Sequence, residues 1–458
     1  MEFIGREKEL ARLKKVYQSK GYEGVLLYGR RRIGKSELVK RSMQEESCKR
    51  IYFECTKVSE ASNTKAFCEA IAHVFGIPVP AYTHFADALE YVFLMSEKEP
   101  IILAIDEYPY LRAKIEACDS VFQKVIDTHA MSCRMKFILC GSAIEVMCSL
   151  DDRDNPLYNR FGTTITLTQM NYYESARFYP DFTPEDKVRI YSVFGGVPYF
   201  NQFVDDSLSV KENLLELVAS PGARLDGEPS RLLESELSRL ENANEVFLAI
   251  AGGARKFSDI LSQAHVSSSP TLADVLTRLM NMDVVKKDNP INVNSQNRTI
   301  YTISDRLLLF WYKYIFPRVS AFAIMPPERF FSEFIETDFE NSFVPHAYEE
   351  IARQYLVRMN LEGKSDPVLY QVGKYYYDNP KERKNGEFDV VTESKDGFDF
   401  YEVKFTKKPV DDSVVREETF QLERAGVKVN RMGFFSRNGF NVTDPEKYIL
   451  IDLEDVYR

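Results

Sequence analysis

The sequence of 458 residues predicts an α/β protein with more than one domain. Three observations support this fold class. Residues 1–170 alternate short apolar strands with segments of helical length, residues 242–315 show three helices followed by two strands, and residues 328–458 combine helices with hairpin-forming strands. A chain of this length exceeds one ordinary hydrophobic core, so two to four domains are expected.

The strands of the first region are apolar runs rich in β-branched and aromatic residues: GVLLYG (24–29), RIYFEC (50–55), PIILAID (100–106), KFILCG (136–141) and TTITLT (163–168). Helical segments such as Lys35–Gln44 and Lys65–Phe75 separate them. This alternation predicts a largely parallel sheet with helices on its faces. Residues 171–235 then show a helical pattern.

Composition narrows the class of protein. The chain has no run of 18 apolar residues and begins with charged residues, so we expect a soluble, cytoplasmic protein with no membrane segment. Its seven cysteines show no CxxC spacing, which argues against a zinc ribbon or a disulfide framework. A net charge of −10 means that any contact with nucleic acid has to come from local basic patches.

A phosphate-binding loop is predicted at GRRRIGKS, residues 29–36, directly between a strand and a helix. In the pattern GxxxxGK[ST], Gly29 and Gly34 permit the turn, and backbone N–H groups hold phosphates. Lys35 reaches the outer phosphates of ATP, and Ser36 offers its hydroxyl to Mg²⁺. The alternative interpretation, a basic surface turn, does not account for the strand and helix on either side.

Acidic and polar residues at two further strand ends complete this predicted site. Asp106 and Glu107 end the apolar strand IILAID, where ligands of parallel sheets gather. We predict that Asp106 holds Mg²⁺ and that Glu107 orients or deprotonates the attacking water. Ser142 follows the strand KFILCG and is a candidate sensor of the γ-phosphate. Without the loop upstream, a solvent-exposed strand end would be the better interpretation of the two acids.

The first 235 residues resemble a known ATPase family. The motifs that carry the resemblance are FIGREKEL (3–10), LLYGRRRIGKSELV (26–39), LAIDEYPYL (103–111), ILCGSA (138–143), PLYNRF (156–161) and GGVPYF (195–200). In order and spacing they are similar to archaeal and bacterial P-loop ATPases of the STAND class, relatives of the AAA+ ATPases. The resemblance implies that Gly5 and Arg6 lie near the adenine, and that the turn at Pro198 contacts nucleotide from a helical lid. The ATPase domain with its lid is thus predicted over residues 1–235.

Residues 236–327 are predicted to form a winged helix-turn-helix domain and a linker, since three short helices precede a two-stranded wing. The recognition helix would be Thr271–Met280, which offers little positive charge beyond Arg278. Lys286, Lys287 and Arg298 on the wing are the other basic candidates. Because DNA contacts rely on basic residues, the sequence leaves DNA binding and domain packing as equal alternatives.

Near the carboxyl end, GEFDVVTESKDGFDFYEVKF (386–405) predicts a hairpin with unusual charges on one face. Side chains alternate along strands, so Glu387 shares a face with Asp389, and Glu402 shares one with Lys404. A turn at Lys395-Asp396 would place Asp389 opposite Glu402, which is destabilising unless something compensates. A divalent cation is one candidate, and a solvated face with a Glu387–Lys404 pair is the alternative.

Residues 328–458 resemble the PD-(D/E)xK nuclease core, a restriction-endonuclease-like α/β fold, and a nuclease-like domain of unknown function fused to such ATPases. The resemblance rests on Asp389, on Glu402-Val403-Lys404 and on an acid from the helix HAYEEIARQYL (346–356). Further matches are VGKYYY (372–377), FFSRNGF (434–440) and ILIDLEDVY (449–457). It implies that Asp389, Glu402 and Glu349 bind Mg²⁺ or Mn²⁺, with Glu349 preferred to Glu350. Lys404 would orient the attacking water or neutralise charge.

Two functions follow as alternatives. In the first, nucleotide state at the P-loop controls a metal-dependent nuclease-like domain that acts on DNA. In the second, the chain is a STAND-type signalling or scaffold ATPase whose winged helix and end domain bind protein partners or self-associate without cleavage. A third and simpler version is an ATPase with an inactive accessory domain.

Overall fold

The chain divides into two units in the computed structural model: unit 1 is Met1–Gln169 and unit 2 is Met170–Arg458. The structure describes residues 3–236, 242–293, 298–379 and 384–458. Helices predicted to form a lid, within residues 171–235, share the hydrophobic core of unit 2. The division into three domains at residues 235 and 327 stays a prediction.

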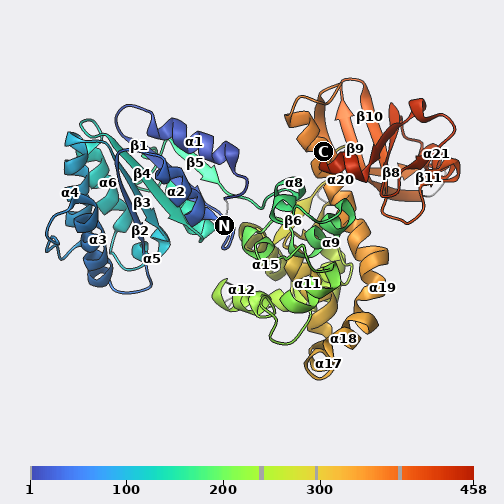
Figure 1. Ribbon diagram of the computed structural model, residues 1–458, viewed down its shortest axis with the longest axis horizontal. Coiled ribbons are helices and arrows are strands. Elements are labelled where there is room, and N and C mark those ends of the chain that lie inside the picture. The colour runs from blue at the N-terminus through green and yellow to red at the C-terminus, as the bar shows by residue number, and fades with distance from the viewer. Residues whose placement is uncertain (1–2, 237–241, 294–297, 380–383) are drawn as a thin grey trace. The chain divides into compact units, whose positions relative to one another are not determined.

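Unit 1 is built on a parallel sheet (Figure 1). Its strands are β1 (Glu23–Tyr28), β2 (Lys49–Glu54), β3 (Ile101–Asp106), β4 (Met135–Gly141) and β5 (Thr163–Thr166). Within the described residues their order is β2-β3-β4-β1-β5, with every pair parallel. The predicted parallel sheet is therefore confirmed. Since β4 lies between β1 and β3, the ends of these three strands form one edge where the predicted ATP site lies.

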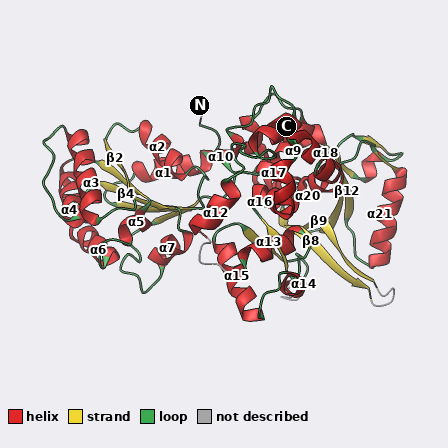
Figure 2. Ribbon diagram, turned by 90° about the horizontal axis from the view of Figure 1, so that it is seen from below, coloured by secondary structure: helices red, strands yellow, loops and turns green. Residues whose placement is uncertain are grey.

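Helices cover both faces of this sheet (Figure 2). They are α1 (Glu7–Tyr17), α2 (Lys35–Gln44), α3 (Glu60–Phe75), α4 (Phe85–Lys98), α5 (Tyr108–Arg112), α6 (Cys118–His129) and α7 (Ile144–Cys148). One core joins α1 and α2 to alternate strand residues such as Val25 and Ile138. The other joins α3, α4 and α6 to intervening residues such as Leu26 and Phe137. The strands are apolar throughout because both faces are buried.

Unit 2 begins with a helical region and a short hairpin. The helices are α8 (Tyr172–Ser175), α9 (Pro184–Phe194), α10 (Pro198–Asn201), α11 (Val210–Leu217), α12 (Glu228–Glu236), α13 (Ala243–Ala251), α14 (Phe257–Gln263) and α15 (Ser269–Asn281). Antiparallel strands β6 (Val285–Asp288) and β7 (Ile300–Ile303) follow. The last three helices and the hairpin have the order predicted for a winged helix. Its identification as a winged-helix domain stays a prediction.

A long apolar helical stretch follows the wing. Among the described residues, Arg306–Ile324, which comprises α16 (Arg306–Phe310), a π-helical and a 3-10 turn and α17 (Val319–Ile324), meets the length and composition of a membrane span. Much of it is buried inside unit 2: Leu307, Phe310 and Tyr314 are among its core residues. We interpret it as a core helix, and the cytoplasmic location stays a prediction.

The helical region over residues 327–361 is interrupted. It consists of α18 (Pro327–Phe334), α19 (Glu336–Asp338), a π-helical turn (Phe339–Phe343) and α20 (Val344–Leu361). Pro345 has no N–H to donate, so regular hydrogen bonding cannot run through this point. The π-helical turn keeps Phe339 and Phe343 in the core of unit 2.

The carboxyl-terminal part of unit 2 holds a mixed sheet. Its elements are β8 (Leu369–Asn379), β9 (Lys384–Ser394), β10 (Gly397–Lys404), β11 (Val410–Asp411), α21 (Asp412–Ala425), β12 (Arg431–Ser436), β13 (Phe440–Asn441), β14 (Ile449–Asp452) and α22 (Leu453–Tyr457). The larger sheet has the order β14-β12-β10-β9-β8 in the described residues. β8, β9 and β10 are antiparallel, and α21 leads from β10 to the parallel strand β12.

Candidate functional site

The loop 29–34 joins β1 to α2 and needs glycine at both ends. Gly34 has φ 91°, a left-handed conformation that other residues adopt only with strain. A Cβ on Gly29 would lie 2.3 Å from the carbonyl oxygen of Leu167 on the neighbouring chain segment. The GxxxxGK spacing is therefore a requirement of the backbone itself.

Lys35 is buried within this loop, with 5% of its surface exposed. Its Nζ donates hydrogen bonds of 2.8 Å to the carbonyl oxygens of Gly29 and Arg30. An ammonium group in a buried position requires such partners. The loop thus holds a positive charge where the sequence predicts the outer phosphates of ATP.

Ser36 and Asp106, the two predicted magnesium ligands, are brought together. Ser36 Oγ donates a 2.5 Å hydrogen bond to Asp106 Oδ2, and Tyr52 donates another of 2.5 Å to the same oxygen. Burial raises the pKa of Asp106, but the hydrogen bonds from Ser36 and Tyr52 outweigh this and leave the pKa below its ordinary value. Hydroxyl and carboxylate oxygens are the ligands that Mg²⁺ prefers, so this pair fits the ion.

Glu107 lies next to Asp106 and is held by Ser142. Its backbone has φ 51°, an uncommon conformation for glutamate. Ser142 Oγ donates to the Glu107 carboxylate, with 2.9 Å to each oxygen, and Ser142 N lies 3.4 Å from Oε2. Because β4 is the neighbour of β3 in the sheet, Ser142, which directly follows β4, can hold the acid that follows β3. The two residues are thus one arrangement rather than two separate features.

Gly5 and Arg6 lie beside the phosphate loop. Both have left-handed backbones, and Arg6 is buried. Arg6 Nη2 donates to the carbonyl oxygens of Thr168, at 2.6 Å, and Ile33, at 3.3 Å. The contact with Ile33 brings this segment to the loop, although its contact with adenine stays a prediction.

Pro198 belongs to unit 2, where it begins α10. Gly196, two residues before it, has a packing role there, since a Cβ on Gly196 would lie 1.8 Å from the carbonyl oxygen of Met170. Its contact with nucleotide stays a prediction.

The hairpin β9–β10 has the predicted turn at Lys395-Asp396. The pairing of its two strands ends at Tyr401 with Val390, one residue before Glu402 and Asp389. Burial raises the pKa of Glu402, and the Asp389 charge contributes in the same direction, while a direct pairing of the two acids across the hairpin stays a prediction.

Lysines compensate for the charges of the two acids. Asp389 accepts a hydrogen bond from Lys374 of β8, and Glu402 accepts one from Lys404. The alternative Glu387–Lys404 pair is absent from the ion pairs of the described residues, and Glu387 instead lies 4.0 Å from Lys374 Nζ. Among the residues that the structure describes, no three His, Cys, Asp or Glu side chains form a group that could hold a metal. Lys374 was not among the residues predicted for this site.

The two glutamates of α20 have different environments. Glu350 accepts hydrogen bonds from Arg353, at 2.7 Å, and Lys286, at 3.0 Å. Burial raises the pKa of Glu350, yet these cations bring it well below its ordinary value. The charge of Glu349 instead raises the pKa of Glu402, after the larger effect of burial. Of the two glutamates, Glu349, the one preferred from the sequence, is thus the one whose charge raises the pKa of Glu402.

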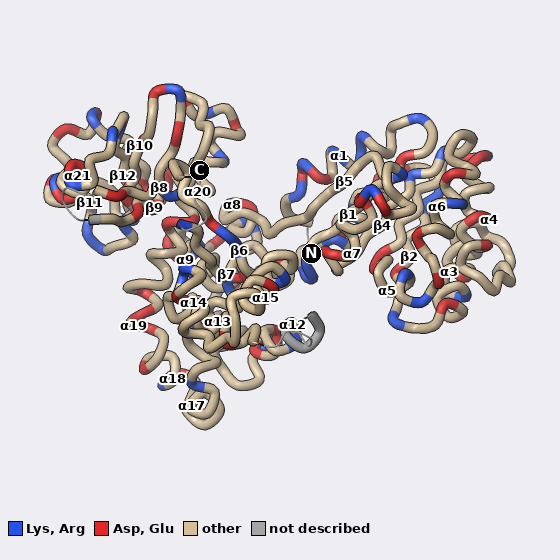
Figure 3. Tube along the Cα trace, turned by 180° about the vertical axis from the view of Figure 1, so that it is seen from behind, with Lys and Arg blue, Asp and Glu red and all other residues tan. Residues whose placement is uncertain are grey.

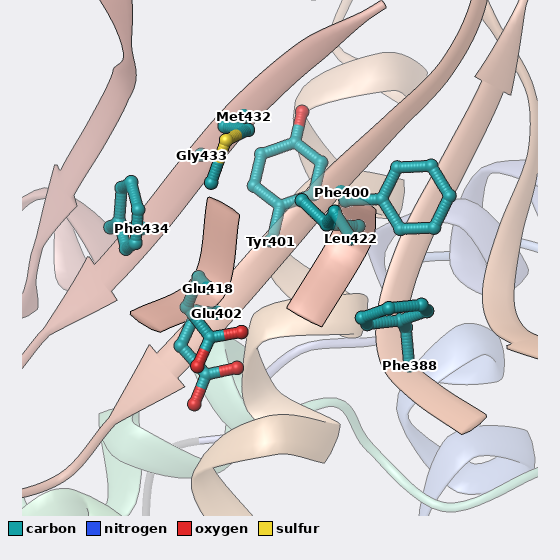
Figure 4. Close-up of a pocket in the computed structure, with 9 residues that line it drawn as sticks. All are labelled: Phe388, Phe400, Tyr401, Glu402, Glu418, Leu422, Met432, Gly433 and Phe434. Atoms are coloured by element: carbon teal, nitrogen blue, oxygen red, sulfur yellow. The ribbon is translucent and has the colours of Figure 1, made fainter. Parts of the chain in front are cut away.

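Glu418 of α21 is a further acid at this site that the sequence analysis missed. It is 6% exposed, and its Oε1 lies 3.9 Å from Lys404 Nζ. Glu418 and Glu402 line a small cavity whose other walls are apolar (Figure 4). Those walls are Phe388, Phe400, Tyr401, Leu422, Met432, Gly433 and Phe434. Burial raises the pKa of Glu418 to about 7, and the Glu402 charge contributes in the same direction.

Figure 3 marks the lysines and arginines along the Cα trace, and three of those predicted as DNA contacts, Arg278, Lys286 and Arg298, make ion pairs within unit 2. Lys286 lies 3.0 Å from Glu350, and Arg278 lies 3.1 Å from Asp274. Arg298 covers the ring of Tyr376 at 4.0 Å and lies 3.9 Å from Asp378. Of the two alternatives for this region, these contacts favour packing within the chain.

Two separate segments of the chain match known protein families. Residues 3–200 match the family described as an ATPase domain predominantly from Archaea. Residues 3–200 therefore contain an ATPase domain with a P-loop. Residues 311–418 match archaeal and bacterial proteins of unknown function.

Individual relatives extend the likeness beyond the ATPase domain. An uncharacterised protein of Methanocaldococcus jannaschii is 26% identical over 377 residues, which are 82% of each chain. A solved Walker-type ATPase of Pyrococcus abyssi has a TM-score of 0.53 at 19% identity, covering 68% of this chain and 96% of its own. The ORC2 protein of Aeropyrum pernix, solved with ADPNP and ADP, has a TM-score of 0.48 at 16% identity over 70% of this chain and 96% of its own. The Pyrococcus structure supports the fold of the ATPase part.

Proposed function

We propose that the ATPase domain binds ATP with Mg²⁺ and hydrolyses it. The observation that carries this proposal is the hydrogen bond between Ser36 and Asp106, directly beside the loop that buries Lys35. Backbone N–H groups of the loop and Lys35 would bind the phosphates. Ser36 and Asp106 would hold Mg²⁺, which neutralises phosphate charge when bound.

Glu107 is the residue proposed to position the attacking water. Its carboxylate follows the metal-binding Asp106 in the chain, and Ser142 limits its orientation. A carboxylate in this place can accept a proton from water, and general-base catalysis contributes about 10²–10⁴-fold. Removing it should therefore affect turnover far more than affinity.

Two substitutions separate binding from hydrolysis. We expect Lys35→Ala to abolish ATP binding in calorimetry, and Glu107→Gln to retain binding while phosphate release falls by about 10²-fold or more. Glu54→Gln is the matched control, because Glu54 is an exposed acid at the end of the neighbouring strand. Equal ATP affinity for Lys35→Ala and the wild type would contradict the phosphate-loop assignment. A normal rate for Glu107→Gln would place the base elsewhere.

As a second function, we propose that nucleotide state controls a nuclease-like site in residues 328–458 that acts on DNA. One support is that the charges of Glu349 and Asp389 both raise the pKa of Glu402, in addition to the larger effect of burial. The other is the order of the elements: α20 is followed by three antiparallel strands, then by α21 and a parallel strand. For carboxylate oxygens of these three acids to hold Mg²⁺ or Mn²⁺, the lysine at Asp389 would have to be displaced and the acids would have to move closer together than they lie in this structure. Lys404 would neutralise charge on the phosphate.

Cleavage assays test this second proposal. The intact chain is incubated with single- and double-stranded DNA and RNA, with and without ATP, in Mg²⁺ or Mn²⁺. We expect Asp389→Ala and Lys404→Ala to lose cleavage, whereas Lys408→Ala, a change to an exposed lysine nearby, should retain it. Absence of cleavage under every condition would leave the alternative, a STAND-type scaffold ATPase that binds protein partners or self-associates.

A further inference from the structure

We propose that Lys374 occupies the cation position at Asp389, and that a divalent metal ion can bind there only by displacing it. Lys374 would thus set the metal affinity of the site. This inference rests on the proposed nuclease-like function of the same residues.

The strand pairing directs Lys374 toward Asp389. The register of β8 and β9 shifts by one residue between two pairs, Gly373 with Val391 and Tyr375 with Phe388. Lys374 therefore faces two residues of β9, Asp389 and Val390, where a regular ladder would offer one. Such a bulge re-aims side chains. The lysine meets the acid because of this irregularity.

Lys374 is strongly held. Only 7% of its surface is exposed, and its Nζ donates a hydrogen bond to the Asp389 carboxylate. Burial raises the pKa of Asp389, but the Lys374 charge outweighs this and brings the pKa below its usual value, with Arg353 and Arg255 contributing. The Asp389 side chain is still 44% exposed, so a metal ion can approach it from solvent.

Both acids of the site have a lysine partner without a metal. Lys374 pairs with Asp389, and Lys404 pairs with Glu402. A divalent ion at Asp389 would face the Lys374 ammonium within a few ångströms of the same oxygen atoms, and like charges repel strongly at that distance. The ion and the ammonium are therefore alternatives.

The wing fixes the backbone of the strand that carries Lys374. Ile291 N donates a 2.8 Å hydrogen bond to the Lys374 carbonyl oxygen. The Asn292 side chain bonds both backbone groups of Tyr376, accepting from N at 3.0 Å and donating to O at 2.7 Å. Displacement by a metal would thus move the lysine side chain and leave β8 in place.

Calorimetric titration of the intact chain with MnCl₂, without nucleotide, tests the inference. Lys374→Met should bind Mn²⁺ at least about tenfold more tightly than the wild type, the factor expected when an ion pair of about 1.4 kcal/mol no longer has to be broken. Adding Asp389→Asn to this variant should abolish the gain. Lys313→Met is the matched control, since Lys313 forms a 2.8 Å ion pair with Asp338 elsewhere in unit 2.

The outcomes separate the inference from the proposed function. Tighter Mn²⁺ binding without cleavage of DNA would support the role of Lys374 and refute the nuclease. Cleavage by the wild type, with equal Mn²⁺ affinity in Lys374→Met, would refute the role of Lys374 alone. Should Lys374→Met not fold, Lys374→Gln takes its place, because glutamine keeps a hydrogen-bond donor to Asp389 but carries no charge. Lys374→Gln must then show the same gain in Mn²⁺ affinity. A folded Lys374→Gln with wild-type affinity would overturn the inference.

Discussion

Replacing Glu418 by glutamine should change how the stability of unit 2 depends on pH. Glu418 is almost fully buried, and its pKa rises from 4.5 to about 7 in the folded chain. Between these values the unfolded chain has released the proton while the folded chain keeps it. The free energy of unfolding therefore falls as pH rises from about 4.5 to 7, and this contribution is constant above pH 7.

The size of the effect follows from the two pKa values. They differ by about 2.5, and at 1.36 kcal/mol per unit the stability lost across this range is about 3 kcal/mol at most. Glutamine resembles the protonated acid and does not ionise. Relative to the wild type, Glu418→Gln should therefore gain up to about 3 kcal/mol between pH 5 and pH 8.

The single tryptophan of the chain provides the assay. Trp311 is buried in the core of unit 2, so its fluorescence during urea denaturation reports on that unit. Glu417→Gln is the control, because Glu417 is adjacent in sequence but exposed. The reasoning would be refuted if Glu418→Gln and the wild type lost stability in parallel from pH 5 to pH 8, or if Glu417→Gln showed the same gain.

Two further predictions concern hydrogen bonds. Ser142→Ala removes the hydroxyl that holds Glu107, so phosphate release should fall while calorimetric ATP affinity stays unchanged; an unchanged rate would mean that Ser142 does not position the acid. Tyr172→Phe removes a buried 2.8 Å bond to the Val456 carbonyl oxygen, and should lower the stability of unit 2, followed by Trp311 fluorescence, by about 1 kcal/mol. A loss near zero would show that this bond to the end of the chain contributes nothing net.

The residues brought together at the proposed ATP site were predictable because each of their signals lies within a short segment. The spacing of Gly29, Gly34 and Lys35 encodes one turn between a strand and a helix, and Asp106 stands at the end of an apolar strand. Parallel strands bring such ends to one edge of the sheet. Tyr52, which bonds Asp106, was not predictable, because an aromatic residue in a buried strand normally signals core packing.

The carboxyl-terminal site was predictable only in part. Turn length by itself sets the register of β9 against β10, which runs from Ser394 with Gly397 to Val390 with Tyr401. The identity of the compensating cation depended on a bulge between β8 and β9, for which the sequence has no local signal. The one signal in the sequence for this role of Lys374 was its position in a strand that is otherwise rich in tyrosine.

The sequence by itself determined where the chain forms a phosphate loop, a parallel sheet and a charged hairpin, because these depend on neighbouring residues and on regular periodicity. The tertiary structure alone decided which charges pair. Glu418 reaches Lys404 only because α21 packs on the sheet, and Lys286 reaches Glu350 only because the tertiary fold brings β6 close to α20. Ion pairs of this kind join side chains from separate elements, and their partners are chosen by packing and burial.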